Sequence, residues 1–162
     1  EGIPAGLKTA WFHVEFGNFA MAASVLKKAS NSRKTETKQG ARKLLDYVGE
    51  KMTKQIEAAK TAETDGKAWQ AYRGYSDAAV RYKGYELPKD ITATINKLKG
   101  SADVKKEVAA LRILGAAKRR LYGKSVSARK SGFRALERLA DQQSETQAGQ
   151  EALRLIKSLG MP

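Results

Sequence analysis

The chain has 162 residues, of which 41% are hydrophobic and 30% are charged, and its formal net charge is +14. This length is enough for one domain with a hydrophobic core, and the composition excludes an intrinsically disordered chain. The sequence has no cysteine, which excludes disulfide bonds, thiolate catalysis and cysteine-based metal sites within it. Its longest apolar runs cover only a few residues, which argues against a membrane-spanning helix.

Hydrophobic residues recur at intervals of three and four along most of the chain, which is the spacing of one face of an α-helix. The helices predicted from this period cover residues 4–16, 18–29, 35–65, 69–82, 88–99, 101–122, 125–139 and 144–159. No segment alternates apolar and polar residues over a sustained length, so we predict no strand.

Small polar residues precede several of these helices and are expected to cap their N-termini. They are Asn18, Thr35, either Ser101 or Asp103, Ser125, and either Ser144 or Thr146. Gly49 falls within the long third helix, where glycine costs about 1 kcal/mol relative to alanine. A bend or a split of that helix near Gly49 is therefore an open alternative.

Two stretches of the chain share a pattern of glycine and small residues at the same spacing. The first contains Gly17, Phe19, Ala22, Leu26 and Ala29, and the second contains Gly66, Ala71, Tyr75 and Ala78, with Ala68 in place of the aromatic residue. This spacing resembles the second half of a tetratricopeptide repeat (TPR). The resemblance implies that each glycine makes the turn between two antiparallel helices, and that the small alanine lets the second helix approach its neighbours closely.

A third similarity joins the middle of the chain to its end. It aligns Tyr72, Tyr75, Ile95 and Leu98 with Phe133, Leu136, Ile156 and Leu159. The first half of the TPR pattern is not matched and the period is irregular, so we expect a TPR-like domain and not a regular array. We predict an all-α fold of seven to nine helices, in which antiparallel helical hairpins stack as a short, right-handed, TPR-like solenoid. The alternative is an ordinary orthogonal helical bundle.

One domain is expected over residues 1–162, with 1–65 and 66–162 as alternative sub-units. The run from IPAGLKTAWFHVEFGNFAMAASVLKKA through AYRGYSDAAVRYKGYELP to TQAGQEALRLIKSLG is also similar to the helical extension that follows the thioredoxin-like domain in some exported bacterial proteins. This resemblance favours an exported or periplasmic location, which the rest of the sequence leaves unknown. The chain has no C-x-x-C motif, so the redox activity of such proteins cannot be carried over to it.

Groups typical of an active site are sparse. His13 is the only histidine and lies one residue from the apolar stripe of its helix, without a nearby carboxylate cluster. The carboxylates are scattered and form no paired acid/base motif. We therefore expect no enzyme activity, no cofactor and no metal site, and an enzyme of unrecognised type is only the third hypothesis.

Aromatic residues gather in and after the predicted helix at 69–82. They are Trp69, Tyr72, Tyr75, Tyr82 and Tyr85. They could form a stacking platform or a peptide groove, but for Trp69, Tyr72 and Tyr75 we favour the interpretation that they fill the junction between hairpins. Tyr85 follows in a turn, where we expect it to be exposed.

The segment from Val108 to Ala135 contains eight basic residues and no acidic residue. They are Arg112, Lys118, Arg119, Arg120, Lys124, Arg129, Lys130 and Arg134. The two helices that carry them meet at Gly123, so their charges can converge at one corner. Arg129 and Lys130 lie near the start of a helix, where the helix dipole is also positive, so an anion or an acidic partner would stabilise them.

Two functions are compatible with these features. The leading hypothesis is a non-catalytic interaction or scaffold domain that binds a protein partner, or self-assembles, within a larger assembly. The alternative is binding of nucleic acid or another polyanion through the basic corner. The same residues also fit a basic face that is only solvated and binds no partner.

Overall fold

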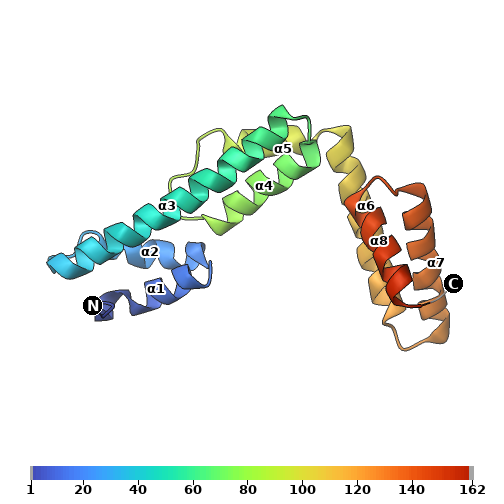
Figure 1. Ribbon diagram of the computed structural model, residues 1–162, viewed down its shortest axis with the longest axis horizontal. Helices are drawn as coiled ribbons and strands as arrows, with labels where there is room; N and C mark the ends of the chain where they lie inside the picture. The colour runs from blue at the N-terminus through green and yellow to red at the C-terminus, as the bar shows by residue number, and fades with distance from the viewer. Residues whose placement is uncertain (1, 161–162) are drawn as a thin grey trace. The chain divides into compact units, whose positions relative to one another are not determined.

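The computed structural model describes residues 2–160. Over this range the chain forms eight α-helices and one short 3-10 helix, and it forms no strand (Figure 1). The elements are the 3-10 helix Ala5–Leu7, α1 (Lys8–Glu15), α2 (Phe19–Ala29), α3 (Thr35–Thr64), α4 (Ala68–Arg81), α5 (Ile91–Lys99), α6 (Ala102–Leu121), α7 (Val126–Gln142) and α8 (Gln147–Ser158). The prediction of an all-α chain is confirmed, and each predicted helix is present.

The contacts between helices divide the chain into two compact units, one ending at Lys99 and the other beginning at Gly100. The alternative border after residue 65 falls inside the first unit, where α3 and α4 on either side of it pack against each other.

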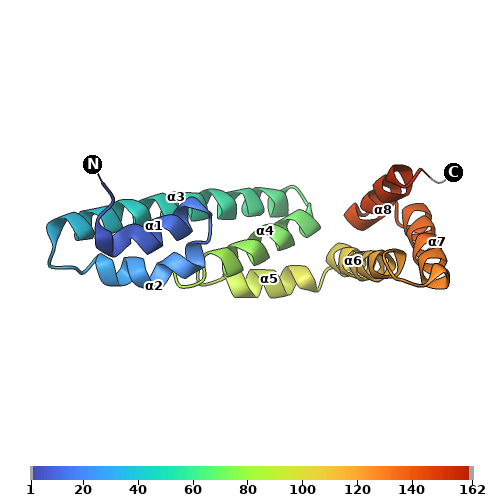
Figure 2. The ribbon, with the colours of Figure 1, turned by 90° about the horizontal axis from the view of Figure 1, so that it is seen from below.

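In the first unit, α1 and α2 form a hairpin beside the N-terminal half of α3, while α4 packs along its C-terminal half and α5 packs on α4 (Figure 2). The helix α3 runs without a break for 30 residues, so the split near Gly49 does not occur. A Cβ atom added at Gly49 would meet nothing within 4 Å, so this glycine lies on the open side of α3. The core of the unit includes the fully buried side chains of Leu7, Leu26, Val48 and Tyr82.

The helices α1 and α3 end in the same way. Gly17 has a φ of +71° and Gly66 a φ of +74°, in the left-handed region that glycine adopts without a steric cost. The amide after each glycine donates to the carbonyl five residues back, at 2.8 Å in both cases, and each glycine amide donates to the carbonyl three residues back. This is the Schellman arrangement of a helix C-terminus, and it occurs once in each copy of the repeated glycine pattern.

The small residues of the repeated pattern lie inside the unit. Ala22, Ala71 and Ala78 are all 0% exposed, and Leu26 is equally buried. Ala29 and Tyr75 are also buried, and Phe19 stacks on Tyr82 with ring centroids 5.3 Å apart. The buried alanines have short side chains, so neighbouring helix backbones can approach closely at their positions.

The predicted helix caps are only partly observed. The side chains of Ser101, Ser125 and Thr146 accept hydrogen bonds from the amides of Val104, Ala128 and Gly149. Asn18 occupies the N-cap position of α2, but its side chain accepts no cap hydrogen bond. The prediction for Thr35 is wrong, because Thr35 is the first residue of α3 and Lys34 precedes it at the N-cap position without a side-chain cap.

In the second unit, α6, α7 and α8 form a three-helix bundle in which each helix contacts the other two. The backbones of α6 and α7 approach closely at Gly132, where an added Cβ atom would lie 2.6 Å from the Leu121 nitrogen. The core side chains include Leu114, Leu136 and Leu139. Leu136 is buried like Tyr75 of the first unit, the residue with which the third similarity aligns it.

Candidate binding surfaces

The eight basic residues of the predicted corner do not share one face. Lys118 turns towards α8, where its ammonium pairs with the Glu151 carboxylate at 3.2 Å. Arg129 turns back to the α6–α7 turn, where its Nη1 donates to the carbonyl oxygens of Gly123 at 3.3 Å and Lys124 at 3.1 Å. The remaining six are exposed on α6, on the turn and on α7: Arg112, Arg119, Arg120, Lys124, Lys130 and Arg134.

The position of Arg129 changes the expected electrostatics at the start of α7. The sequence places this cation beside the positive end of the helix dipole, where an anion would stabilise it. In the structure the guanidinium is directed at two carbonyl oxygens of the preceding turn, which carry partial negative charge. Arg129 is thus a structural cation of the turn, and it needs no bound anion.

A narrower set of basic side chains lines the outer face of α7. We define the α7 basic face as Ser127, Lys130, Ser131, Arg134 and Arg138, all of them exposed. With Val126 they border a shallow hollow of about 510 Å³. The three cations recur at every fourth position and therefore lie on one side of the helix. The buried residues of α7, including Leu136 and Leu139, lie on the opposite side.

Arg138 was missed in the sequence because it follows Glu137 and so lies beyond the segment without acidic residues. The signal that could have identified it was the helical spacing of four from Lys130 to Arg134 and from Arg134 to Arg138. A run of charge along the sequence is a weaker indicator than charge on one helix face.

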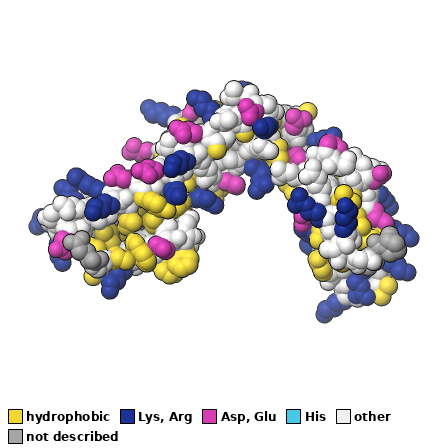
Figure 3. Space-filling view, viewed as in Figure 1, with side chains coloured by type: hydrophobic (Ala, Val, Ile, Leu, Met, Phe, Trp, Pro, Cys, Tyr) yellow, Lys and Arg dark blue, Asp and Glu magenta, His cyan; other side chains and the backbone are white. Residues whose placement is uncertain are grey.

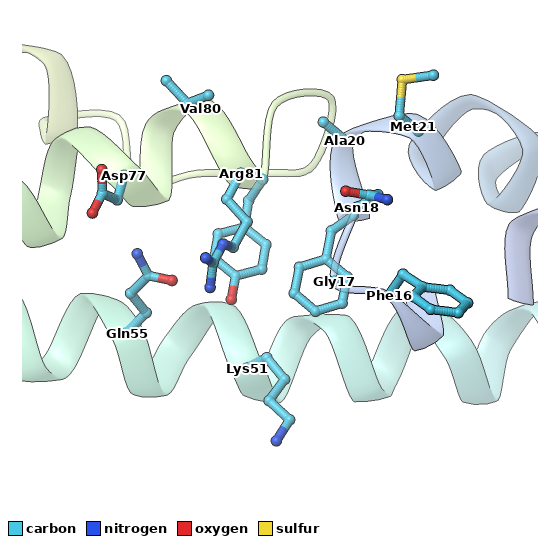
Figure 4. Close-up of a pocket in the computed structure, with 12 residues that line it drawn as sticks. Phe16, Gly17, Asn18, Ala20, Met21, Lys51, Gln55, Asp77, Val80 and Arg81 are labelled. Carbon is cyan, nitrogen blue, oxygen red and sulfur yellow. The ribbon is translucent and has the colours of Figure 1, made fainter. Parts of the chain in front are cut away.

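A larger hollow of about 880 Å³ lies in the first unit, between the α1–α2 turn and the C-terminal part of α4, above α3 (Figure 4). We call it the α2–α4 groove. Arg81 extends from α4 into the space, and Gln55 points into it from α3. The Gln55 amide donates to the Gly74 carbonyl at 3.3 Å, which ties α3 to α4 at this place.

Large hydrophobic side chains surround this groove and remain in contact with solvent. Phe16 and Met21 are each 65% exposed and Val80 is 74% exposed. Phe12, also exposed, packs on Phe16 with ring centroids 4.6 Å apart. Figure 3 shows hydrophobic side chains gathered over the α1 side of this unit. A cluster of exposed apolar side chains around a groove is typical of an interaction site.

The sequence did not identify the α2–α4 groove. Phe16, Met21 and Val80 each lie off the hydrophobic stripe of their own segment, and an isolated apolar residue on a helix surface is ordinary. Only packing of the α1–α2 hairpin and α4 on the same long helix brings the three residues to one place.

The aromatic residues around α4 mostly fill the core. Tyr75 is 7% exposed and Tyr82 is 1% exposed, and Trp69 stacks on Tyr72 with ring centroids 5.7 Å apart. The expectation that Tyr85 is exposed is wrong. It is half-buried, and its hydroxyl donates to the Phe19 carbonyl oxygen at 3.0 Å. Burial raises the pKa of Tyr85 to about 12.

His13 is half-buried in α1, with an edge contact to the Phe12 ring at 5.9 Å between centroids. Its Nδ1 is buried and has no hydrogen-bond partner among the residues that the structure describes. Among residues 2–160, no three His, Asp or Glu side chains lie together in a way that could hold a metal ion. In the same range, every helix is too short or too polar to cross a membrane.

Comparison of the chain with protein-family models, with curated proteins and with solved structures found no match. Two surfaces of the chain have a chemistry that indicates a function. One is a groove rimmed by apolar side chains in the first unit, and the other is a helix face of cations and hydroxyls in the second.

Proposed function

We propose that this chain is a non-catalytic interaction domain whose first unit binds a segment of a protein partner in the α2–α4 groove. The observation that carries the proposal is the exposure of Phe16, Met21 and Val80 around one hollow. Leaving large apolar side chains in water is unfavourable by about 25 cal/mol per Å², and a partner that covers them recovers this free energy.

The arrangement of the first unit supports a TPR-like stack of hairpins as the scaffold for this groove. The turns at Gly17 and Gly66 have the same hydrogen-bond pattern, and Ala22 and Ala71 are buried at equivalent places after them. In addition, α1 contacts α3 and α2 contacts α4, as expected when the second hairpin stacks on the first.

The groove also limits the chemistry of the partner. Its polar lining includes two cations, Lys51 and Arg81, and one carboxylate, Asp77. The Lys51 ammonium lies 5.2 Å from the Tyr47 ring centroid, and Arg81 extends into the space. We infer a partner segment that places apolar side chains against Phe16 and its neighbours and a carboxylate near Arg81, as an amphipathic helix can do.

Selection of peptides against the full chain tests this proposal. A displayed library of amphipathic peptides is selected on the wild-type chain, and the binders are measured against the separate variants Phe16→Asp and Val80→Asp. Each substitution places a charge at the rim, and we expect affinity losses of about tenfold or more. The control is Leu153→Asp, because Leu153 is an exposed apolar residue of the second unit, away from the groove.

The results that would support the proposal differ from those that would overturn it. The proposal is supported by peptides whose affinity falls with both rim variants and is unchanged with the control. Such peptides should also shift the amide resonances of residues 16–21 and 77–82 of the chain. Peptides that bind both rim variants as well as the wild type would overturn it, as would a selection that yields no binder. A dimer that forms with concentration and disappears with Phe16→Asp would identify a second copy of the chain as the occupant, in place of a different protein.

A further inference from the structure

We propose that the α7 basic face binds the phosphodiester backbone of a nucleic acid without reading its sequence. This surface belongs to the second unit and shares no residue with the α2–α4 groove, so the inference goes beyond the function proposed above. It would let one chain hold a protein with one unit and a nucleic acid with the other.

The side chains of the α7 basic face have the chemistry that phosphate groups require. Lys130, Arg134 and Arg138 are exposed, and within residues 2–160 none of them has a carboxylate within salt-bridge distance. Residues four apart on a helix rise by about 6 Å, so the three cations form a row along α7. Ser127 and Ser131 place hydroxyl donors on the same side. Arginine, lysine and serine side chains are common donors to phosphate oxygens.

The acidic residues of α7 are unevenly distributed along the row of cations. Glu137 and Asp141 lie towards its C-terminal end, so the positive charge of α7 that no nearby carboxylate offsets lies mainly around Lys130 and Arg134. The N-terminal end of the helix dipole adds positive potential at the first turn, beside Ser127. Lys124 in the preceding turn is also exposed.

An acidic protein, a membrane surface and a sulfated polysaccharide fit the face less well than a nucleic acid. A protein interface needs an apolar centre, and among the described residues Val126 is the one apolar side chain that borders this hollow. A helix that binds a membrane surface inserts its apolar side, but the apolar side of α7 is buried in the three-helix bundle. Tyr122, 72% exposed just before α7, can stack on an unpaired base, which a sulfated polysaccharide does not offer.

Fluorescence anisotropy with labelled oligonucleotides tests the inference on the full chain. A single strand long enough to span α7 and the corresponding duplex, each in several sequences, are titrated at increasing salt. The triple variant Lys130→Gln, Arg134→Gln, Arg138→Gln is compared with the control Lys54→Gln, Lys60→Gln, Lys89→Gln, which removes the same charge from exposed positions of the first unit.

We expect the α7 variant to lose about tenfold or more in affinity, and its slope of log K against log salt to fall by about two. The control should change affinity by less than about threefold, and different sequences should bind alike. Equal losses in both variants would show that net charge alone is responsible and would overturn the proposal. So would absence of binding at low salt, or binding to anionic vesicles or heparin without binding to nucleic acid. Peptide binding in the α2–α4 groove should be unchanged in the α7 variant, so the two proposals can fail separately.

Discussion

Gly74 in α4 lies directly against Ala59 in α3, because a Cβ atom at position 74 would be only 2.8 Å from the Ala59 Cβ and 3.3 Å from its Cα. These atoms belong to packed helices and cannot move aside as a flexible side chain can. We expect Gly74→Leu to destabilise the first unit by about 1–3 kcal/mol through overpacking. Urea unfolding followed by tryptophan fluorescence measures this, since Trp11 and Trp69 both lie in the first unit.

The matched control is Gly49→Ala in α3, where an added Cβ atom meets nothing within 4 Å. Alanine is favoured over glycine in a helix interior, so this substitution should stabilise the unit by about 1 kcal/mol. The two glycine variants should therefore shift the urea midpoint in opposite directions. A midpoint that rises in both would show that α3 and α4 are not in close contact at Gly74.

A second prediction concerns the buried alanine of the repeated pattern. Ala71 is 0% exposed, and replacing it with Trp should force the helices apart and destabilise the first unit by about 1–3 kcal/mol. Thermal unfolding is followed by far-UV circular dichroism, because the substitution itself adds a fluorophore. Ala58→Trp serves as the control, since Ala58 is exposed on α3. Equal melting temperatures in the two variants would contradict a close helix contact at Ala71.

The two Schellman turns give a third prediction. Gly17→Ala and Gly66→Ala each force an L-residue into a left-handed conformation, at a cost of about 1–2 kcal/mol. No neighbouring atom lies within 4 Å of an added Cβ at either position, so backbone strain alone should set the loss. Similar losses in the two variants, measured by urea unfolding, are expected if the turns are equivalent. Gly66→Asn should lose less, because asparagine tolerates this conformation better.

The helices could be predicted from the sequence because their signals are local. Apolar residues at spacings of three and four, a glycine such as Gly66 after a helix and a cap such as Thr146 before one require no knowledge of the rest of the chain. The close approach at Gly74 could not be predicted in this way. It depends on which two helices cross at that point, and a glycine inside a helix pattern equally fits the open position of Gly49.

The candidate surfaces show the same limit. Charge in the sequence indicated a basic region, but the rotation of each helix decides which cations share a face. Lys118 pairs with Glu151 and Arg129 serves the α6–α7 turn, whereas Arg138 joins Lys130 and Arg134. The α2–α4 groove gave no local signal, because its apolar residues come together only through the packing of two hairpins on α3.

The half-buried Tyr85, whose hydroxyl donates to Phe19, makes the stability of the first unit depend on pH. Burial raises the pKa of Tyr85 from 10.0 to about 12, so the neutral phenol is favoured in the folded state. The contribution of the neutral phenol to the free energy of unfolding is complete below pH 10 and is lost as the pH rises through 12. Tyr85→Phe lacks the hydrogen bond to Phe19 and should be less stable by about 1 kcal/mol at neutral pH. The difference should shrink above pH 10, and a difference that stays constant to pH 12 would contradict the assignment.

A carboxylate of α6 supports the start of α8 across the second unit. Glu107 is only 8% exposed, and its Oε1 accepts a hydrogen bond from the Gln147 amide at 2.9 Å. Glu107→Ala removes this acceptor from a helix N-terminus and should destabilise the unit by about 1–2 kcal/mol. Glu107→Gln keeps an oxygen at the same position and should retain part of the stability. Hydrogen exchange of the Gln147 amide reports the contact directly, and exchange that is no faster in Glu107→Ala than in the wild type would contradict this role.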